Sequence, residues 1–336
     1  MGFPIQDKLV VGITSSALFD LAQEHEIFQN EGVEAFRKYQ QDNRKKTPLP
    51  GSAFPFVQRL LQLNEKFPEH RPVEVIILSR NDPKAGLRIM EAMPEHGLDI
   101  TRSFFLSGDD PFKYLSSVGG ALYLSANKEE VKRASAKGHP AGWVLPTDVI
   151  PLSDELDTQL RIAFDFDGVL VDDEAERKYK DGGLDLFQRH EIEHKARPLK
   201  DGPLMPLLKK ISRIQQIERE HSQRVNDPQK AVRVSVVTAR NAPAHERMMH
   251  TLEHHGLEID ELFLTGGIDK KNILDVLKPQ IFFDDQLGHL EPAAATTPSV
   301  HIPFGIRNQE IEPATVIEAP PAKMGAHKGR SAIRSK

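Results

Sequence analysis

Short hydrophobic runs alternate with longer amphipathic stretches along most of this chain. Stretches such as Phe56–Phe67 and Ala244–His254 have hydrophobic residues at helical spacing. The short runs are rich in β-branched and aromatic residues, as is typical of buried strands: Val10–Thr14, Val73–Leu78, Ala121–Leu124, Leu160–Phe164, Val232–Val237 and Gln280–Phe283. Strands that alternate with helices predict an α/β fold, in which helices cover a parallel sheet.

The chain also contains an internal repeat. SRNDP at 79–83 matches ARNAP at 239–243, and FFLSG at 104–108 matches LFLTG at 262–266. Further matches keep the same order: GVEAF at 32–36 with GLDLF at 183–187, PLPGSAFPF at 48–56 with PLKDGPLMPL at 198–207, and HGL at 96–98 with HGL at 255–257. A colinear set of this kind predicts two Rossmann-like parallel-sheet halves, at 8–150 and 158–305. Residues 306–336 are rich in Pro, Ala and charge and predict a disordered tail.

Composition narrows the class of protein. The 336 residues are enough for two domains, and 39% of them are hydrophobic. The absence of cysteine excludes disulfides and thiolate sites and favours a reducing cytoplasm. The net charge of −5 provides no basic field for nucleic acid. No apolar run reaches about 18 residues, and the N-terminus lacks the pattern of a secretory signal. We therefore expect a cytoplasmic protein without nucleic-acid or membrane partners, and a homo-oligomer stays open.

Acidic residues follow two of the predicted strands. Asp165 and Asp167 come after one strand, Asp284 and Asp285 end another, and Thr238 ends a third. The carboxyl ends of parallel strands meet at one edge of a sheet, so these side chains are expected to converge there. Carboxylates that converge repel one another unless a cation neutralises them, and oxygen ligands without Cys or His favour Mg²⁺. The four aspartates are therefore the predicted metal ligands.

The first half lacks these acids. In the repeat, Thr14 takes the place of Asp165, and Ser16 takes the place of Asp167. At the other strand end, Ser125 and Ala126 stand where the second half has Asp284 and Asp285. Acids that only supported the fold would be expected in both halves. We therefore predict that the chemistry belongs to the second half alone.

The second half has the groups that phosphate chemistry requires. A cation, a lysine such as Lys270 and a hydroxyl such as that of Thr238 together make a site for a phosphate dianion. One carboxylate beside the phosphate can attack it, and a second can protonate the leaving oxygen and later activate water. The pattern predicts hydrolysis of a phosphate monoester.

In combination, DFDGV, VVTAR, a lysine and FFDD resemble the four motifs of the haloacid dehalogenase-like (HAD-like) phosphatases. ITSSALFDL, GSAFPFV, the valine of DFDGV, VTARNAP and FFDDQLGH narrow the resemblance to the cytosolic 5′-nucleotidase I family, over about residues 8–305. The resemblance implies an Mg²⁺-dependent enzyme that hydrolyses nucleoside 5′-monophosphates through an aspartyl-phosphate. It also implies that each half has the HAD-like fold.

The resemblance implies a role for each matching residue. Asp165 would be the nucleophile and a metal ligand. Asp167 would be the acid/base, with its backbone carbonyl on the metal. Thr238 would hydrogen-bond the phosphate, and Lys270 would pair with the phosphate and with Asp165, with Lys271 as the alternative. Asp284 and Asp285 would complete the metal site.

Substrate recognition is expected around a small helical cap at about 172–230. Within it, Phe187 and His190 are candidates to contact the base, and Arg240 and Asn241 follow Thr238 directly. The alternatives are that Phe187 belongs to the cap core, that the cap histidines are exposed, and that Arg240 and Asn241 serve the fold. The first half keeps Arg80 and Asn81, the counterparts of that last pair.

Three wider alternatives stay open. The chain is a phosphatase of the same fold with another small phosphate ester as its substrate, or it is a non-catalytic nucleotide-binding protein. The first half is either a structural partner of the second or the holder of a regulatory nucleotide.

Overall fold

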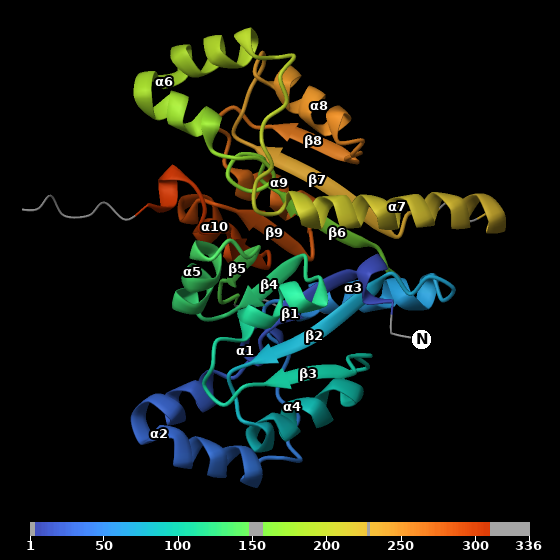
Figure 1. Cartoon of the computed structure of the whole chain (residues 1–336), viewed down its shortest axis with the longest axis vertical. Coiled ribbons are helices and arrows are strands. Elements are labelled where there is room, and N and C mark those ends of the chain that lie inside the picture. Colours follow the sequence, from blue (N-terminus) through green and yellow to red (C-terminus); the bar gives the residue numbers. More distant parts are fainter. Residues whose placement is uncertain (1–3, 148–156, 227–228, 310–336) are drawn as a thin grey trace, which may run out of the picture.

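A single ten-stranded sheet runs through the computed structural model, which describes residues 4–147, 157–226 and 229–309 (Figure 1). Its strand order is β3-β2-β1-β4-β5-β10-β9-β6-β7-β8. The strands are β1 (Leu9–Ile13), β2 (Val73–Ser79), β3 (Arg102–Phe105), β4 (Leu122–Ser125), β5 (Ala141–Val144), β6 (Leu160–Phe164), β7 (Val232–Thr238), β8 (Glu261–Leu264), β9 (Ile281–Asp284) and β10 (Ser299–His301).

The sheet is parallel except at its centre. There β5 and β10 run antiparallel, with His301 opposite Trp143. The order from one edge to this junction is β3-β2-β1-β4-β5, and from the other edge it is β8-β7-β6-β9-β10. Within each set the strands are parallel, and the two sets run in opposite directions, so the carboxyl ends of β9, β6 and β7 share the edge at which the acidic residues follow.

Helices cover the sheet on both faces (Figure 1). The α-helices are α1 (Ser15–Leu18), α2 (Ala22–Asp42), α3 (Phe54–Lys66), α4 (Pro83–Glu95), α5 (Lys128–Ala136), α6 (Glu174–Glu193), α7 (Met205–Val225), α8 (His245–His254), α9 (Lys270–Leu277) and α10 (Leu287–Ala294). Short 3₁₀ turns are η1 (Ile5–Asp7), η2 (Pro111–Tyr114), η3 (Ser116–Val118) and η4 (Ile306–Asn308).

The main core crosses the centre of the sheet. Phe56 of α3 meets Phe283 of β9 edge-on, with ring centroids 6.3 Å apart, and Phe283 stacks on Phe164 of β6 at 5.2 Å. The same buried cluster includes Val11 of β1 and Leu207 of α7. Each fully buried side chain of this size contributes about 1.5–3 kcal/mol to folding. Residues from 8–150 and from 158–305 thus stabilise one shared core.

Two helices are bent at glycine. The α2 ribbon breaks at Gly32, where φ is +85°, and α6 breaks at Gly183, where φ is +66°. Glycine reaches this left-handed region without the strain that a Cβ brings. Both helices fold back into hairpins at opposite ends of the molecule (Figure 1). Within the predicted cap at 172–230, α6 stands away from the sheet, whereas α7 buries five hydrophobic side chains toward the core: Met205, Leu207, Leu208, Ile211 and Ile214.

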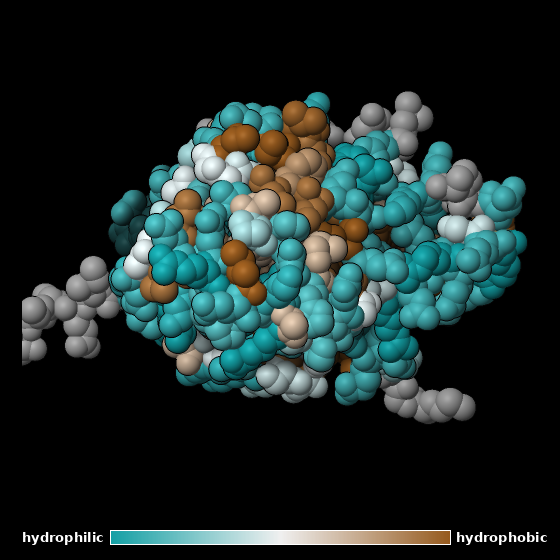
Figure 2. Space-filling view, turned by 90° about the horizontal axis from the view of Figure 1, so that it is seen from above, coloured by the Kyte–Doolittle hydropathy of each residue, from teal (hydrophilic) through white to brown (hydrophobic). Residues whose placement is uncertain are grey.

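The sequence predictions of an α/β class and of a large, mostly parallel sheet are confirmed. The six predicted strands appear as β1, β2, β4, β6, β7 and β9. Four strands of three or four residues, β3, β5, β8 and β10, were not predicted. Runs of this length show no clear periodicity, although β4 and β9, also of four residues, were predicted. In the part of the chain that the structure describes, no helix combines the length and the apolar character of a membrane span. Figure 2 shows a face that is mostly hydrophilic, with a hydrophobic band across it.

Candidate active site

Three neighbouring strands deliver the predicted site residues to one edge of the sheet. Asp165 follows β6, Thr238 is the last residue of β7, and Asp284 is the last residue of β9. Because β9, β6 and β7 are adjacent, the three strand ends lie together. The backbone amide of Asp165 donates to the carbonyl of Phe283 at 2.8 Å, so β6 and β9 stay paired up to the acids.

Lys270 joins two of the aspartates. Its Nζ lies 2.9 Å from Oδ2 of Asp165 and 2.7 Å from Oδ2 of Asp284, and its side chain is 1% exposed. Lys270 is the first residue of α9. The side chain of the Asp269 cap accepts a hydrogen bond from the backbone amide of Lys271, which fixes this helix start. Lys271, the alternative from sequence, turns away and pairs with Asp275 at 2.5 Å. The lysine at the acids is therefore Lys270.

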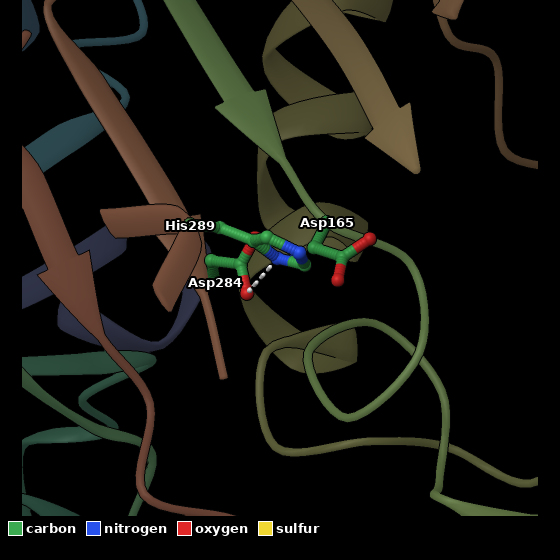
Figure 3. A group of neighbouring side chains, drawn as sticks. All are labelled: Asp165, Asp284 and His289. Carbon is green, nitrogen blue, oxygen red and sulfur yellow. Dashed lines mark hydrogen bonds and ion pairs between the residues drawn. The ribbon is translucent and has the colours of Figure 1, made fainter. Parts of the chain in front are cut away.

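His289 belongs to this group, and the sequence analysis missed it. Its Nδ1 lies 3.1 Å from Oδ2 of Asp284. Ligand-type atoms of Asp165, Asp284 and His289 all lie within 4.8 Å of one another. Figure 3 shows the imidazole beside the Asp284 carboxylate, with Asp165 entering from its own strand. A histidine inside FFDDQLGH, in the helix that follows the acids, was the available signal, because the first turns of α10 return to the strand end.

Asp285 is the most isolated acid of the site. Its Oδ1 is buried and has no hydrogen-bond partner among the described residues. Gly168 lets it approach, since a Cβ there would lie 2.7 Å from Cγ of Asp285, and φ at Gly168 is +72°. The backbone carbonyl of Asp285 accepts hydrogen bonds from His301 Nε2 at 3.0 Å and Asn308 Nδ2 at 2.9 Å. The acid is thus held in place by its backbone while its carboxyl oxygen stays unsatisfied.

Burial and mutual repulsion shift the pKa values of these acids. Burial, together with the charges of Asp165 and Asp284, raises the pKa of Asp285 to about 9. Burial also raises the pKa of Asp165 to about 7, although Lys270 opposes the shift. For Asp284, Lys270 and His289 outweigh burial and lower the pKa. One ammonium group does not neutralise three buried carboxyls, and a divalent cation would. An orphaned carboxyl oxygen and an all-oxygen acid set fit Mg²⁺.

Asp167 has a different partner. Its two carboxylate oxygens accept hydrogen bonds from Nε and Nη2 of Arg240, each at 2.7 Å. Arg240 also pairs with Glu191 of α6, and Glu191 pairs with Arg247 of α8 at 2.9 Å. The carboxylates raise the pKa of Arg240 against the effect of its burial, so the guanidinium stays charged. A buried ion network therefore connects Asp167 to the helix hairpin above the site.

The predicted recognition residues lie beside this network. Phe187 is 7% exposed, and the Arg240 guanidinium carbon lies 5.5 Å from its ring centroid. His190 pairs through Nε2 with Glu174 at 2.8 Å. Oδ1 of Asn241 accepts a hydrogen bond from Gln188 at 3.4 Å. Arg240, His190 and Asn241 thus have partners within the protein, and Phe187 is packed against Arg240. The role of these four residues toward a substrate stays a prediction.

The edge has the groups for phosphoryl chemistry. Asp165 offers a carboxylate, Lys270 a buried ammonium group and Thr238 a hydroxyl, which also accepts from the backbone amide of Arg240 at 3.3 Å. Asp167 lies two residues beyond Asp165 on the same turn. Two carboxyl groups and a hydroxyl thus come from the adjacent ends of β6 and β7, and the ammonium group comes from the start of α9.

The chain is similar to known 5′-nucleotidases. A model of the 5′-nucleotidase family matches residues 1–309. Cytosolic 5′-nucleotidase 1B of Homo sapiens is 33% identical to this chain over 294 residues, which are 86% of the chain and 47% of the relative. The chain therefore spans about half the length of that curated relative. No solved structure matches the chain.

Proposed function

Because the chain belongs to the 5′-nucleotidase family, we propose that it hydrolyses nucleoside 5′-monophosphates to nucleoside and phosphate at the edge formed by β9, β6 and β7. The observation that carries the proposal is the bridge that buried Lys270 makes between Asp165 and Asp284. Two carboxylates that converge on one lysine, beside a third with an unsatisfied oxygen, suit a site that takes up a phosphate and a metal ion.

In the first step Asp165 is the nucleophile. Its carboxylate oxygen attacks phosphorus, a new P–O bond forms, and the bond from phosphorus to the ester oxygen breaks. Lys270 and the Thr238 hydroxyl hold the phosphate oxygens and stabilise their charge. Asp167 gives its proton to the departing 5′-oxygen of the nucleoside. The product on the enzyme is an aspartyl-phosphate at Asp165.

In the second step water releases the phosphate. Asp167, now a carboxylate, accepts a proton from water as the water oxygen attacks phosphorus, and the bond to Asp165 breaks. For this role Asp167 must free an oxygen from Arg240, which occupies both of its oxygens in the structure. Arg240 therefore sets when Asp167 faces the substrate.

Mg²⁺ is the proposed cofactor. Asp165, Asp284 and Asp285 would hold it with the backbone carbonyl of Asp167, and the Asp167 side chain would stay with Arg240 or the substrate. His289 lies beside the same acids and would orient Asp284. When bound, the ion supplies positive charge to the transferring phosphate.

We propose that α6 alone forms the cap, with its bend at Gly183. Phe187 and His190 belong to this helix, and Arg240 and Asn241 follow β7 beneath it. Glu191 of this hairpin pairs with Arg240, and Arg240 pairs with Asp167, so the ion network links the hairpin to the proposed acid/base. Closing such a hairpin over the substrate would exclude water before attack.

We also propose that residues 8–150 and 158–305 are two copies of one HAD-like half, of which the second alone is catalytic. The mirrored strand order and the bent helices α2 and α6 support this. The first copy contributes α3 to the shared core and has hydroxyls where the second has acids, such as Ser125 at the end of β4. The name of the human relative supports a cytosolic location.

The test is phosphate release from a panel of nucleoside 5′-monophosphates, their deoxy forms and sugar phosphates. Each would be run with Mg²⁺ and with excess chelator, for the wild type, Asp165→Asn and the control Ser16→Ala. Ser16 is exposed and takes the place of Asp167 in the first half. We expect release from nucleotides that needs the metal and Asp165 and that is unchanged in Ser16→Ala.

Other outcomes would redirect the proposal. A preference for sugar phosphates would keep the chemistry and overturn the substrate. Failure to release phosphate from any compound, with Mg²⁺ and a folded protein, would favour the non-catalytic alternative.

A further inference from the structure

Both bent hairpins are held by a buried arginine from a neighbouring helix. The α2 hairpin packs against α4, and the α6 hairpin packs against α8 (Figure 1). In the first half, Nη1 of Arg88 in α4 pairs with Glu24 in α2. In the second half, Nη2 of Arg247 in α8 pairs with Glu174 in α6 at 3.1 Å. Because the half without the acids of the proposed active site has such a pair too, this pair supports the fold.

The hairpins differ at a second buried partner of that arginine. Gln40 stands as far beyond GVEAF as Glu191 stands beyond GLDLF, so the repeat makes them counterparts. Both accept through Oε1 from Nη1 of the arginine, Gln40 at 3.2 Å and Glu191 at 2.9 Å. Nε2 of Gln40 is buried and has no hydrogen-bond partner in the described part of the chain, whereas Oε2 of Glu191 pairs with Arg240. The carboxylate of the second half thus serves an additional arginine.

That additional arginine separates the two halves as well. Arg80, the counterpart of Arg240 in the repeat, is exposed and donates to a backbone carbonyl at 3.0 Å. Arg240 is buried, and its Nε and Nη2 bind Asp167 while its Nη1 binds Glu191. At the place of Asp167 the first half has the exposed Ser16. The charge of Glu191 therefore accompanies the proposed acid/base and is not required by the hairpin itself.

We propose that Glu191 is a positioning residue that allows Asp167 to leave Arg240 during the reaction. A buried guanidinium that loses its carboxylate is costly. Glu191 holds Arg240 through a nitrogen that Asp167 does not use, so the arginine keeps a counterion while Asp167 turns toward the leaving oxygen. Without Glu191, Asp167 would be the one carboxylate left on Arg240 among the described residues, and it would stay bound there. The inference rests on the proposed function, in which Asp167 moves a proton.

Glu191→Gln tests this role, because the amide keeps the size of the side chain and removes its charge. With a nucleoside 5′-monophosphate and Mg²⁺, we expect kcat to fall about tenfold or more and KM to change by less than about twofold. The control is Glu24→Gln, which removes the carboxylate from a buried arginine pair in the first half and should leave kcat unchanged. An unchanged kcat in Glu191→Gln, or an equal fall in the two variants, would overturn the role.

Glu191→Gln also unbalances a buried ion network, so it is combined with Arg240→Gln, which removes the opposite charge. If Glu191 acts through Arg240, adding Glu191→Gln to Arg240→Gln causes no further fall in kcat. A purely structural effect of Glu191 would persist in that background. A further fall of about tenfold in the double variant would therefore contradict the proposal.

A third measurement does not depend on activity. Urea midpoints in chelator are compared for Glu191→Gln, Asp167→Asn and the double variant. Each single variant leaves Arg240 one carboxylate and the double variant leaves it none, so the double variant should lower the midpoint by more than the sum of the single shifts. The same cycle with Glu24→Gln in place of Glu191→Gln should be additive.

Additive shifts for Glu191 and Asp167 would show that they do not share Arg240 as a counterion and would overturn the inference. Failure of the wild type to release phosphate would overturn the proposed function alone, since the unfolding cycle still reports on the shared arginine.

Discussion

Arg240 holds Asp167 by both carboxylate oxygens, from Nε and from Nη2, at 2.7 Å each. A planar fork of this kind fixes both the distance and the plane of the carboxylate. Asp167 is the proposed acid/base. The pair therefore places the buried Arg240 next to the carboxyl group that would donate and accept the proton. The arginine was expected from sequence to contact the substrate, and the two roles predict different kinetics.

We expect Arg240→Lys to lower kcat about 10- to 100-fold, since an ammonium group cannot reproduce the fork and acid/base catalysis depends on placement. The matched control is Arg80→Lys, because Arg80 occupies the same place in the first half and donates to the carbonyl of Gly108. Steady-state kinetics of both variants give the answer. A higher KM with an unchanged kcat in Arg240→Lys would instead assign Arg240 to substrate binding.

Lys270→Gln removes the cation between two buried carboxylates. We expect the metal-free variant to lose about 3–5 kcal/mol of unfolding free energy near neutral pH, because a buried charge without its partner is costly. The kcat should fall about 100- to 1,000-fold with the loss of a charged donor to the phosphate. Urea unfolding in chelator and steady-state assays measure the two effects.

Lys271→Gln is the control for this change, since Lys271 pairs with Asp275 on the outer face of α9. It should leave kcat unchanged and stability within about 0.5 kcal/mol. Equal effects of the two substitutions would contradict the assignment of Lys270 to the site.

Gly168→Ala tests the approach of Asp285. The new Cβ would lie 2.7 Å from Cγ of Asp285, and the residue would also have to keep φ at +72°. Gly256→Ala separates the two effects, because Gly256 has φ of +64° and open space around its missing Cβ. Both variants should lose about 1–2 kcal/mol of stability through backbone strain. Only Gly168→Ala should weaken Mg²⁺ binding, measured by titration calorimetry, and equal Mg²⁺ affinities would contradict this role of Gly168.

The sequence predicted the parts of the site that lie at strand ends. Asp165, Thr238 and Asp284 each end an apolar run, and the order of parallel strands brings such ends together. The sequence did not predict which elements contact one another. Glu191 and Arg247 sit on separate helices, and their meeting with Arg240 depends on how the α6 hairpin packs. Periodicity reports which face of an element is buried, and it carries no information about which neighbour buries it.

The same limit applies to the sheet. Six strands were predictable because their short runs are rich in β-branched and aromatic residues. The antiparallel pairing of Val144 with Val300 was not, although this junction makes two five-strand sets into one sheet. Both strands are short, with four residues in β5 and three in β10, so neither shows a pattern that names its partner.

The last prediction concerns stability against pH without metal. The pKa values of Asp165, about 7, and of Asp285, about 9, lie above the usual aspartate value of about 3.9. Above that usual value the unfolded chain has released protons that the folded protein still holds. Stability must then fall as pH rises, at most by about 1.4 kcal/mol per pH unit for each group, up to about pH 7 for Asp165 and about pH 9 for Asp285. Urea unfolding in chelator across this range measures the slope.

Asp285→Asn is expected to flatten the curve between the two pKa values, because only Asp285 still titrates there. Saturating Mg²⁺ should reduce the slope in the wild type, since a cation favours the ionised carboxyls and displaces their protons. The direction is opposite to that of an aspartate in a simple salt bridge, whose contribution grows as pH rises. A metal-free stability that increases from about pH 5 to about pH 9 would therefore mean that Lys270 alone neutralises the acids, and that the site does not require a second cation.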